Sequence, residues 1–189
     1  MEKIAARLTD YIFKKGLITE ENYEIYQYGF VCFLEFSIGI LSMLIISISV
    51  GMFWEGLFFI LIFMPLRSFG GGLHLKKFVN CYITSCLILL GTLLIVKYFS
   101  PPNIVSLIIV FVFAVVLLLL GPVDHPNREV DADENKVFVR RTVITVFVCM
   151  ALAIALFVLN KKIYLFLEAV VFTFLLVTNF IGKLYNAKE

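Results

Sequence analysis

The sequence predicts an all-α membrane protein with six transmembrane helices, preceded by an N-terminal amphipathic helix at the membrane interface. Hydrophobic residues make up 61% of the 189 residues and the mean hydropathy is +1.00, whereas a soluble domain averages about 45–50% apolar residues. A globular core of this size could not bury so much apolar surface, so the solvent around the helices must be the lipid bilayer. The apolar residues also gather into six runs, and the basic residues favour one side of them.

The first 28 residues are predicted to form an interfacial amphipathic segment. Apolar side chains recur there at helical spacing: Ile4, Leu8, Tyr11 and Ile12. Charged side chains occupy other positions: Glu2, Lys3, Arg7, Asp10 and Lys14. This pattern is typical of a helix that lies on the inner leaflet. Gly16 is expected to end this helix, and Thr19 with the two glutamates after it predicts the cap and first turn of the next one.

Six apolar runs follow, and each is interpreted as a membrane-spanning helix, which needs about 20 residues to cross the hydrocarbon. They cover Gly29–Gly51, Met52–Leu66, Phe78–Tyr98, Asn103–Leu120, Thr142–Leu159 and Ile163–Ile181. The second run is short, because Trp54 and Glu55 lie near its start and Pro65 is expected to stop it. It is therefore expected to tilt, to thin the bilayer or to form part of a re-entrant element.

Basic residues predict the orientation, since cytoplasmic connections carry an excess of Lys and Arg. With six spans, thirteen of the 16 Lys and Arg residues fall on one side. Lys97, Lys161 and Lys162 fall on the other. Both termini are therefore predicted in the cytoplasm, and residues 121–141 form a charged cytoplasmic loop. We find no internal repeat, so residues 1–189 are expected to form a single polytopic membrane domain.

One pair of residues is suited to chemistry: His74 and Cys81, at the predicted cytoplasmic interface. A thiol needs a nearby base to become a good nucleophile at neutral pH, and an imidazole is the usual one. If residues 74–81 are helical, seven steps return to within about 20° of the same face, whereas Cys86 lies about 120° away from His74. The alternative is an interfacial histidine that happens to lie near a packed thiol, and spacing alone leaves both readings open.

Neighbouring residues have several roles open to them. The glycines at 70–72 indicate a turn or a close approach by another chain, and their amides are candidates to hold an oxyanion. Arg67 is able to snorkel, to bind a substrate carboxylate or to stabilise developing negative charge. Glu35 and Glu168 lie in apolar runs, where a carboxylate usually faces a bundle interior, so either is a candidate to orient His74.

Composition and spacing argue against other classes of site. The charge balance, 16 Lys and Arg against 14 Asp and Glu, argues against a nucleic-acid partner. The four cysteines have no paired motif spacing, so no disulfide framework, zinc site or other cofactor is predicted. His125 follows Asp124, but nothing else in that loop completes a metal site, and we interpret it as a solvated loop residue.

Arg67, Gly71, Gly72, His74 and Cys81, set between the second and third spans, closely resemble the motif of the AgrB family, the accessory gene regulator protein B of Gram-positive bacteria. The resemblance covers essentially the whole chain: its length, its basic amphipathic start, its number of spans and the charged loop after the fourth span. The additional glycine, Gly70, departs from the usual pattern of the family.

The resemblance implies a cysteine endopeptidase of the bacterial cell membrane that processes a small AgrD-type precursor of an autoinducing peptide in quorum sensing. It implies that Cys81 is the nucleophile and His74 the base, and that Arg67 and Gly72, with the adjacent Gly71, support substrate binding or the transition state. It also implies a basic residue in the loop after the fourth span, for which Lys136 is the candidate. Cleavage would leave a thioester on the enzyme, and an internal cysteine of the precursor would then close a thiolactone.

Two other classes of protein remain open on the residues alone. A small transporter or peptide exporter would use Glu35 and Glu168 to line a polar path and would tolerate loss of Cys81. A scaffold protein would tolerate loss of both His74 and Cys81. Partners beyond the precursor and membrane lipid are not predicted, although a symmetric homodimer is compatible with so small a bundle.

Overall fold

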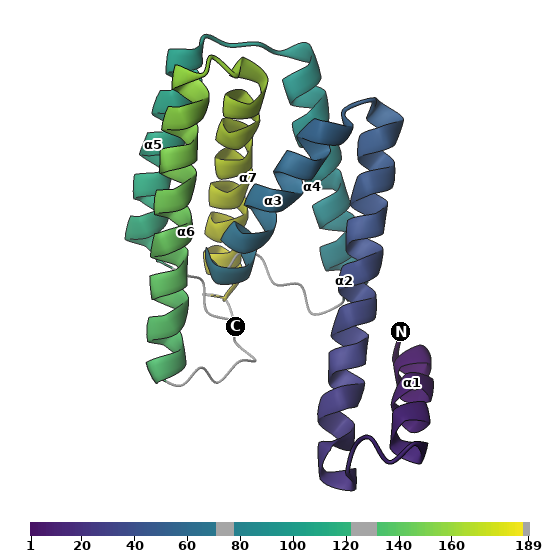
Figure 1. The fold of residues 1–189 in the computed structure, drawn as a ribbon. Coiled ribbons are helices and arrows are strands. Elements are labelled where there is room, and N and C mark those ends of the chain that lie inside the picture. Colours follow the sequence, from purple (N-terminus) through teal and green to yellow (C-terminus); the bar gives the residue numbers. More distant parts are fainter. Residues whose placement is uncertain (71–77, 122–131, 187–189) are drawn as a thin grey trace. The chain divides into compact units, whose positions relative to one another are not determined.

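The computed structural model describes residues 1–70, 78–121 and 132–186, and within these ranges every regular element is a helix. Figure 1 shows their arrangement. In chain order they are α1 Glu2–Lys14, a short 3-10 helix at Glu20–Asn22, α2 Tyr23–Val50, α3 Phe53–Gly70, α4 Phe78–Tyr98, α5 Asn103–Leu120, α6 Ala132–Val158 and α7 Lys162–Asn186. The predicted all-α class is confirmed for this part of the chain.

Five helical segments of the described residues are long and apolar enough to cross a membrane, which indicates a multi-pass membrane protein. They are Glu20–Val50, Phe78–Tyr98, Asn103–Leu120, Lys136–Val158 and Lys162–Lys183. α3 is not among these segments, so the sixth span stays a prediction. Its 18 residues extend over about 27 Å. The expectation that Pro65 stops this helix is wrong, because α3 continues past Pro65 to Gly70 and so includes Arg67.

The start of α6 differs more from its predicted apolar run than any other helix boundary does among the described residues. It begins at Ala132, whereas the run begins at Thr142. The added turns are polar and therefore give no hydropathy signal, yet Ala, Glu and Lys, which occur there, are good helix formers. Residues 132–141, which the sequence places in a loop, are therefore helical.

The chain divides into two compact units, Met1–Ile45 and Ile46–Glu189. In the first unit α1 folds back beside α2. The Tyr23 hydroxyl donates to the Asp10 carboxylate at 2.5 Å, and the rings of Phe13 and Tyr23 meet edge-on with centroids 5.8 Å apart. Ala5 and Thr9 of α1 are fully buried, and small side chains at this spacing allow close helix packing.

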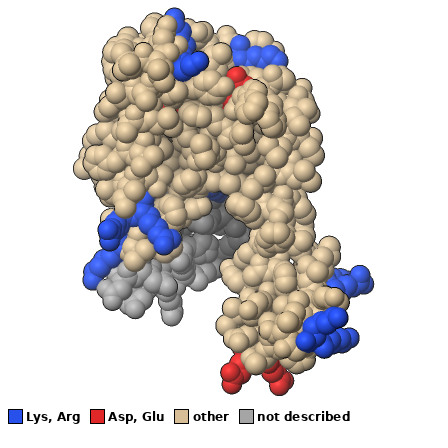
Figure 2. All heavy atoms as spheres, viewed as in Figure 1, with Lys and Arg blue, Asp and Glu red and all other residues tan. Residues whose placement is uncertain are grey.

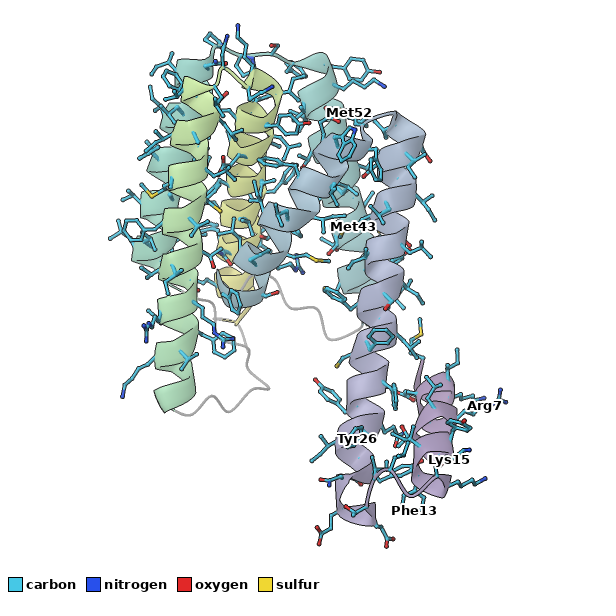
Figure 3. The ribbon with its side chains drawn as sticks, viewed as in Figure 1. Arg7, Phe13, Lys15, Tyr26, Met43 and Met52 are labelled. Carbon is cyan, nitrogen blue, oxygen red and sulfur yellow. The ribbon has the colours of Figure 1, made fainter. Side chains whose placement is uncertain are left out.

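The outer side of α1 carries both charged and apolar residues. Arg7 and Lys15 lie on the side of α1 away from α2, as Figure 3 shows. Ile4 and Leu8 are also exposed. The predicted N-terminal helix is therefore present, while its position at a membrane interface stays a prediction.

In the second unit α7 forms the centre of a bundle and packs against α3, α4, α5 and α6. In its most apolar stretch 61% of the residues are buried, against 28% or less in the other apolar segments. Its buried apolar side chains include Leu165, Leu167, Ala169, Val171, Phe172 and Leu175. Lipid tails are as apolar as these side chains, so close packing between helices is what holds such a bundle together.

Short connections from α2 to α3, from α4 to α5 and from α6 to α7 lie at one end of this unit (Figure 1). Gly51 ends α2 with a φ of +75°, and Lys97 Nζ donates to the Val50 carbonyl at 2.8 Å. At the same end the Asn103 amide donates to Asn160 Oδ1 at 2.8 Å. The end of α3 and the starts of α4 and α6 therefore lie toward the opposite end of the unit.

Lys and Arg side chains are absent from the middle of the second unit on the face that Figure 2 shows. On the face in Figure 2, its Lys and Arg side chains gather near the two ends, and the broad region between them consists of other residues. This is the distribution expected of helices surrounded by lipid.

Candidate functional site

Arg67 and Cys81 are predicted site residues that the structure brings together. Arg67 lies in the last turn of α3 and Cys81 near the start of α4. The Arg67 Nη2 group donates a hydrogen bond to Cys81 Sγ over 3.2 Å, in a partly buried position. The pair therefore forms where α3 ends and α4 begins.

A column of aromatic rings on α3 supports the guanidinium of Arg67. The guanidinium carbon lies 5.7 Å from the centroid of the Phe63 ring, and Phe63 stacks on Phe59 with centroids 4.8 Å apart. Both phenylalanines are almost fully buried. Residues four apart lie above one another on a helix, and a cation over an aromatic ring is attracted to its face. The helix itself therefore holds the arginine in the direction of Cys81.

The contact places a cation beside the Cys81 sulfur. The thiolate, and not the thiol, is the nucleophilic form of cysteine. A nearby positive charge favours the charged form of an acid, and an arginine keeps its charge at every physiological pH. Arg67 therefore keeps a permanent positive charge within hydrogen-bond distance of Cys81 Sγ.

The other three cysteines have different surroundings. Cys86, further along α4, is hydrogen-bonded to Tyr82, whose hydroxyl is uncharged at neutral pH. Cys149 is buried on α6, and Cys32 is exposed in the first unit. An arginine at the sulfur thus distinguishes Cys81 from Cys86, the alternative considered from helical phase.

Several predicted site residues lie outside the described residues: Gly71, Gly72 and His74, together with the loop residue His125. The predicted pairing of His74 with Cys81 is therefore not tested. Lys136 is described and lies, exposed, in the polar part of α6. Among the described residues no group of three or more His, Cys, Asp and Glu side chains could hold a metal ion.

The two carboxylates that lie in apolar helices, Glu168 and Glu35, differ in how far they are buried. Glu168 on α7 is fully buried, and neither of its carboxylate oxygens has a hydrogen-bond partner among the described residues. Glu35 belongs to the first unit and is partly exposed on α2. A third member of the site stays unassigned.

Sequence reasoning missed two residues of α6 that contact the end of α3. Thr142 Oγ1 donates to the Phe69 carbonyl at 2.6 Å, and the Arg141 guanidinium lies over the Phe69 ring, 5.4 Å from its centroid. Their signal in the sequence was ambiguous, because Thr142 opens an apolar run and Arg141 counts simply as one more basic residue of the predicted loop.

Fold and site together define a polytopic helical membrane protein with an arginine-supported cysteine at one end of its bundle. A family model described as AgrB, accessory gene regulator B, matches residues 5–181. The chain therefore belongs to the AgrB family, and membership implies a part in the processing of quorum-sensing peptides. No curated protein and no solved structure gives a significant match.

Proposed function

We propose that this protein is a membrane cysteine endopeptidase that cleaves an AgrD-like precursor and promotes its cyclisation. Cys81 is the nucleophile and His74 is the general base. The observation that carries the proposal is the hydrogen bond from Arg67 to Cys81 Sγ, found in a chain that belongs to the AgrB family. A cationic donor at one particular sulfur is what a thiolate nucleophile requires.

The first half of the reaction forms an acyl-enzyme. His74 accepts the proton of the Cys81 thiol, and the thiolate attacks the carbonyl carbon of the scissile peptide bond. The tetrahedral oxyanion collapses, the carbon–nitrogen bond breaks, and the leaving amine takes the proton from His74. The C-terminal fragment departs, and the N-terminal part of the precursor stays on Cys81 as a thioester.

The second half transfers the acyl group within the precursor. An internal cysteine thiol of the precursor attacks the thioester, a new thioester bond closes the ring, and the Cys81 thiolate leaves and regains a proton. Exchange of one thioester for another conserves the bond type, so the step needs no ATP. Ring closure must be faster than hydrolysis, which favours a site that excludes bulk water once the precursor is bound.

The hydrogen bond from Arg67 to Cys81 Sγ supports two of the roles that are open to Arg67. A guanidinium that donates to the sulfur stabilises the thiolate before attack, and the same group is near the carbonyl when the tetrahedral oxyanion forms. Gly71 and Gly72 are proposed to present backbone amides to that oxyanion, and Lys136 is proposed to bind the acidic part of the precursor.

Orientation and substrate delivery complete the proposal. Thirteen of the 16 basic residues lie on the side that also holds Cys81 if all six runs span, so the site faces the cytoplasm and both termini are cytoplasmic. The precursor is expected to be amphipathic, and α1 to lie on the inner leaflet, so the membrane surface concentrates the two near one another. A homodimer is compatible with this arrangement.

Co-expression with a candidate precursor tests the proposal. Cys81→Ala and His74→Ala are each expected to lower precursor cleavage about a thousandfold or more, because nucleophile and base act as one unit. Cys86→Ala is the matched control on the same helix and is expected to keep cleavage near the wild-type level. Membrane expression of each variant is measured alongside. If Cys86→Ala abolishes cleavage and Cys81→Ala does not, the nucleophile is Cys86 and the proposal is wrong.

An exporter without peptidase activity is the second candidate, and the buried carboxylate of Glu168 favours it. A buried ionisable group in a membrane bundle often marks a transport path. This candidate predicts that Glu168→Gln stops peptide export while Cys81→Ala leaves it intact, so the same co-expression assay separates the two functions.

A further inference from the structure

We propose that Thr142 and Arg141 of α6 are positioning residues that hold the end of α3, and with it Arg67, against Cys81. The inference rests on the proposed function, because it concerns how Arg67 reaches the proposed nucleophile. It assigns a role in the site to a helix that contributes neither the sulfur nor the guanidinium.

The first observation is a hydrogen bond between the two helices. Thr142 Oγ1 lies 2.6 Å from the Phe69 carbonyl oxygen of α3 and 2.9 Å from the Phe138 carbonyl oxygen of its own helix. A hydroxyl has one hydrogen, and the shorter distance is the one to α3. The Phe69 carbonyl is among the last four of α3, which have no partner within an α-helix. Thr142, which is buried, satisfies this carbonyl from outside.

The second observation concerns the side chain of the same phenylalanine. The Arg141 guanidinium lies over the Phe69 ring at 5.4 Å from the centroid, so adjacent residues of α6 hold both the backbone and the ring of Phe69. Phe69 is two residues beyond Arg67 in the last turn of α3. The two contacts therefore fix the turn from which Arg67 extends.

The position of the end of α3 matters because the contact between Arg67 and Cys81 acts only at short range. The contact between Arg67 and Cys81 spans 3.2 Å, and a hydrogen bond is largely lost when its atoms separate by about 1 Å more. α3 and α4 contact one another far less than α3 contacts α6 and α7. The position of the end of α3 is therefore set from the α6 side, and Arg67 reaches Cys81 from there.

The rate of alkylation of Cys81 tests the proposal without needing substrate. The full chain in native membranes is treated with iodoacetamide at neutral pH, and peptide-resolved mass spectrometry gives a separate rate for each cysteine. Cys86 controls for access to α4, and the buried Cys149 reports any loss of folding. The single variants are Arg67→Ala, Thr142→Val, Thr142→Ser and Thr145→Val. A double variant combines Arg67→Ala with Thr142→Val.

The expected pattern follows from the loss of one charge-assisted hydrogen bond. Arg67→Ala is expected to slow alkylation of Cys81 about tenfold, and Thr142→Val about threefold or more. Thr142→Val should add little to Arg67→Ala, since both remove the same contact. Thr142→Ser keeps the donor and should restore the rate. Thr145→Val is the matched control, because the Thr145 hydroxyl bonds to the Arg141 carbonyl within α6, and its rate should equal that of the wild type.

The outcomes separate this inference from the proposed function. A wild-type rate in Thr142→Val, with a slow rate in Arg67→Ala, would overturn the inference and leave the role of Arg67 intact. A wild-type rate in Arg67→Ala would instead remove the proposed role of Arg67. If Thr142→Val makes Cys149 reactive, and so shows a loss of folding, Arg141→Ala is used instead, because Arg141 lies exposed on the surface. Slow alkylation of Cys81 in Arg141→Ala, with Cys149 still protected, supports the inference. An unchanged rate of Cys81 alkylation contradicts it.

Discussion

The hydrogen bond from Arg67 to Cys81 supports the proposed role of the arginine in stabilising charge at the sulfur, which is one of several roles that the sequence left open. From the sequence, snorkelling, substrate binding and charge stabilisation were equally consistent with Arg67. The choice depends on two features with no sequence signal: α3 continues past Pro65, and its end approaches the start of α4. A local pattern could identify the residue but not the atom that it contacts.

Glu168 gives a prediction about stability at the same scale. A polar group that is buried without a partner costs about 1–3 kcal/mol, and both oxygens of Glu168 lack a partner among the described residues. Glu168→Leu is therefore expected to raise the thermal midpoint by about 2–12 °C in detergent. Differential scanning fluorimetry measures the change. Glu168→Gln, which keeps the shape and removes the charge, should give a smaller rise. A lower midpoint for Glu168→Leu would reveal a partner for this carboxylate.

At the scale of elements, hydropathy predicted most helices well. It missed helix ends that are polar or that lie beyond a proline. The apolar runs at Phe78–Tyr98 and Asn103–Leu120 have the same bounds as α4 and α5. α6 begins earlier than the apolar run, because its first turns are polar and give no hydropathy signal. α3 ends later than predicted, because a proline within a membrane helix is tolerated when neighbouring groups replace its missing hydrogen bond.

The packing of α3 against the end of α2 gives a prediction for this scale. A Cβ atom built on Gly56 would lie 1.8 Å from Ser47 Oγ and 2.4 Å from Ser47 Cβ, so the two helices must move apart to admit it. Gly56→Ala is expected to destabilise the protein by about 1–3 kcal/mol. Gly91→Ala is the matched control, since its nearest contact would be an ordinary 3.7 Å to Phe174, and it should be neutral or stabilising. Equal thermal midpoints for the two variants would contradict the close approach.

At the scale of the whole molecule, composition identified the membrane as the solvent, and the motif around Cys81 identified the family that the family model also matches. The division of the chain at Ile45 and Ile46 was not foreseen, because it falls inside the apolar α2, where hydropathy is continuous. The pairing of His74 with Cys81 stays a prediction of the sequence.

Orientation in the membrane is testable by labelling from outside the cell. In a chain whose four cysteines are replaced by alanine, Lys161→Cys and Arg140→Cys introduce single thiols at exposed positions near opposite ends of the second unit. A membrane-impermeant maleimide is expected to label Lys161→Cys in intact cells, and Arg140→Cys only after permeabilisation, because most basic residues lie inside. The reverse pattern would place the proposed site outside the cytoplasm.

The covalent intermediate tests the central claim most directly. Mass spectrometry of the protein isolated with a precursor whose internal cysteine is replaced by alanine should find the N-terminal precursor fragment attached to Cys81, since the acyl group then has no thiol to receive it. The adduct should be sensitive to hydroxylamine, as a thioester is, and absent in Cys81→Ala. Efficient cleavage of the precursor by Cys81→Ala, or an adduct located on Cys86, would contradict the account.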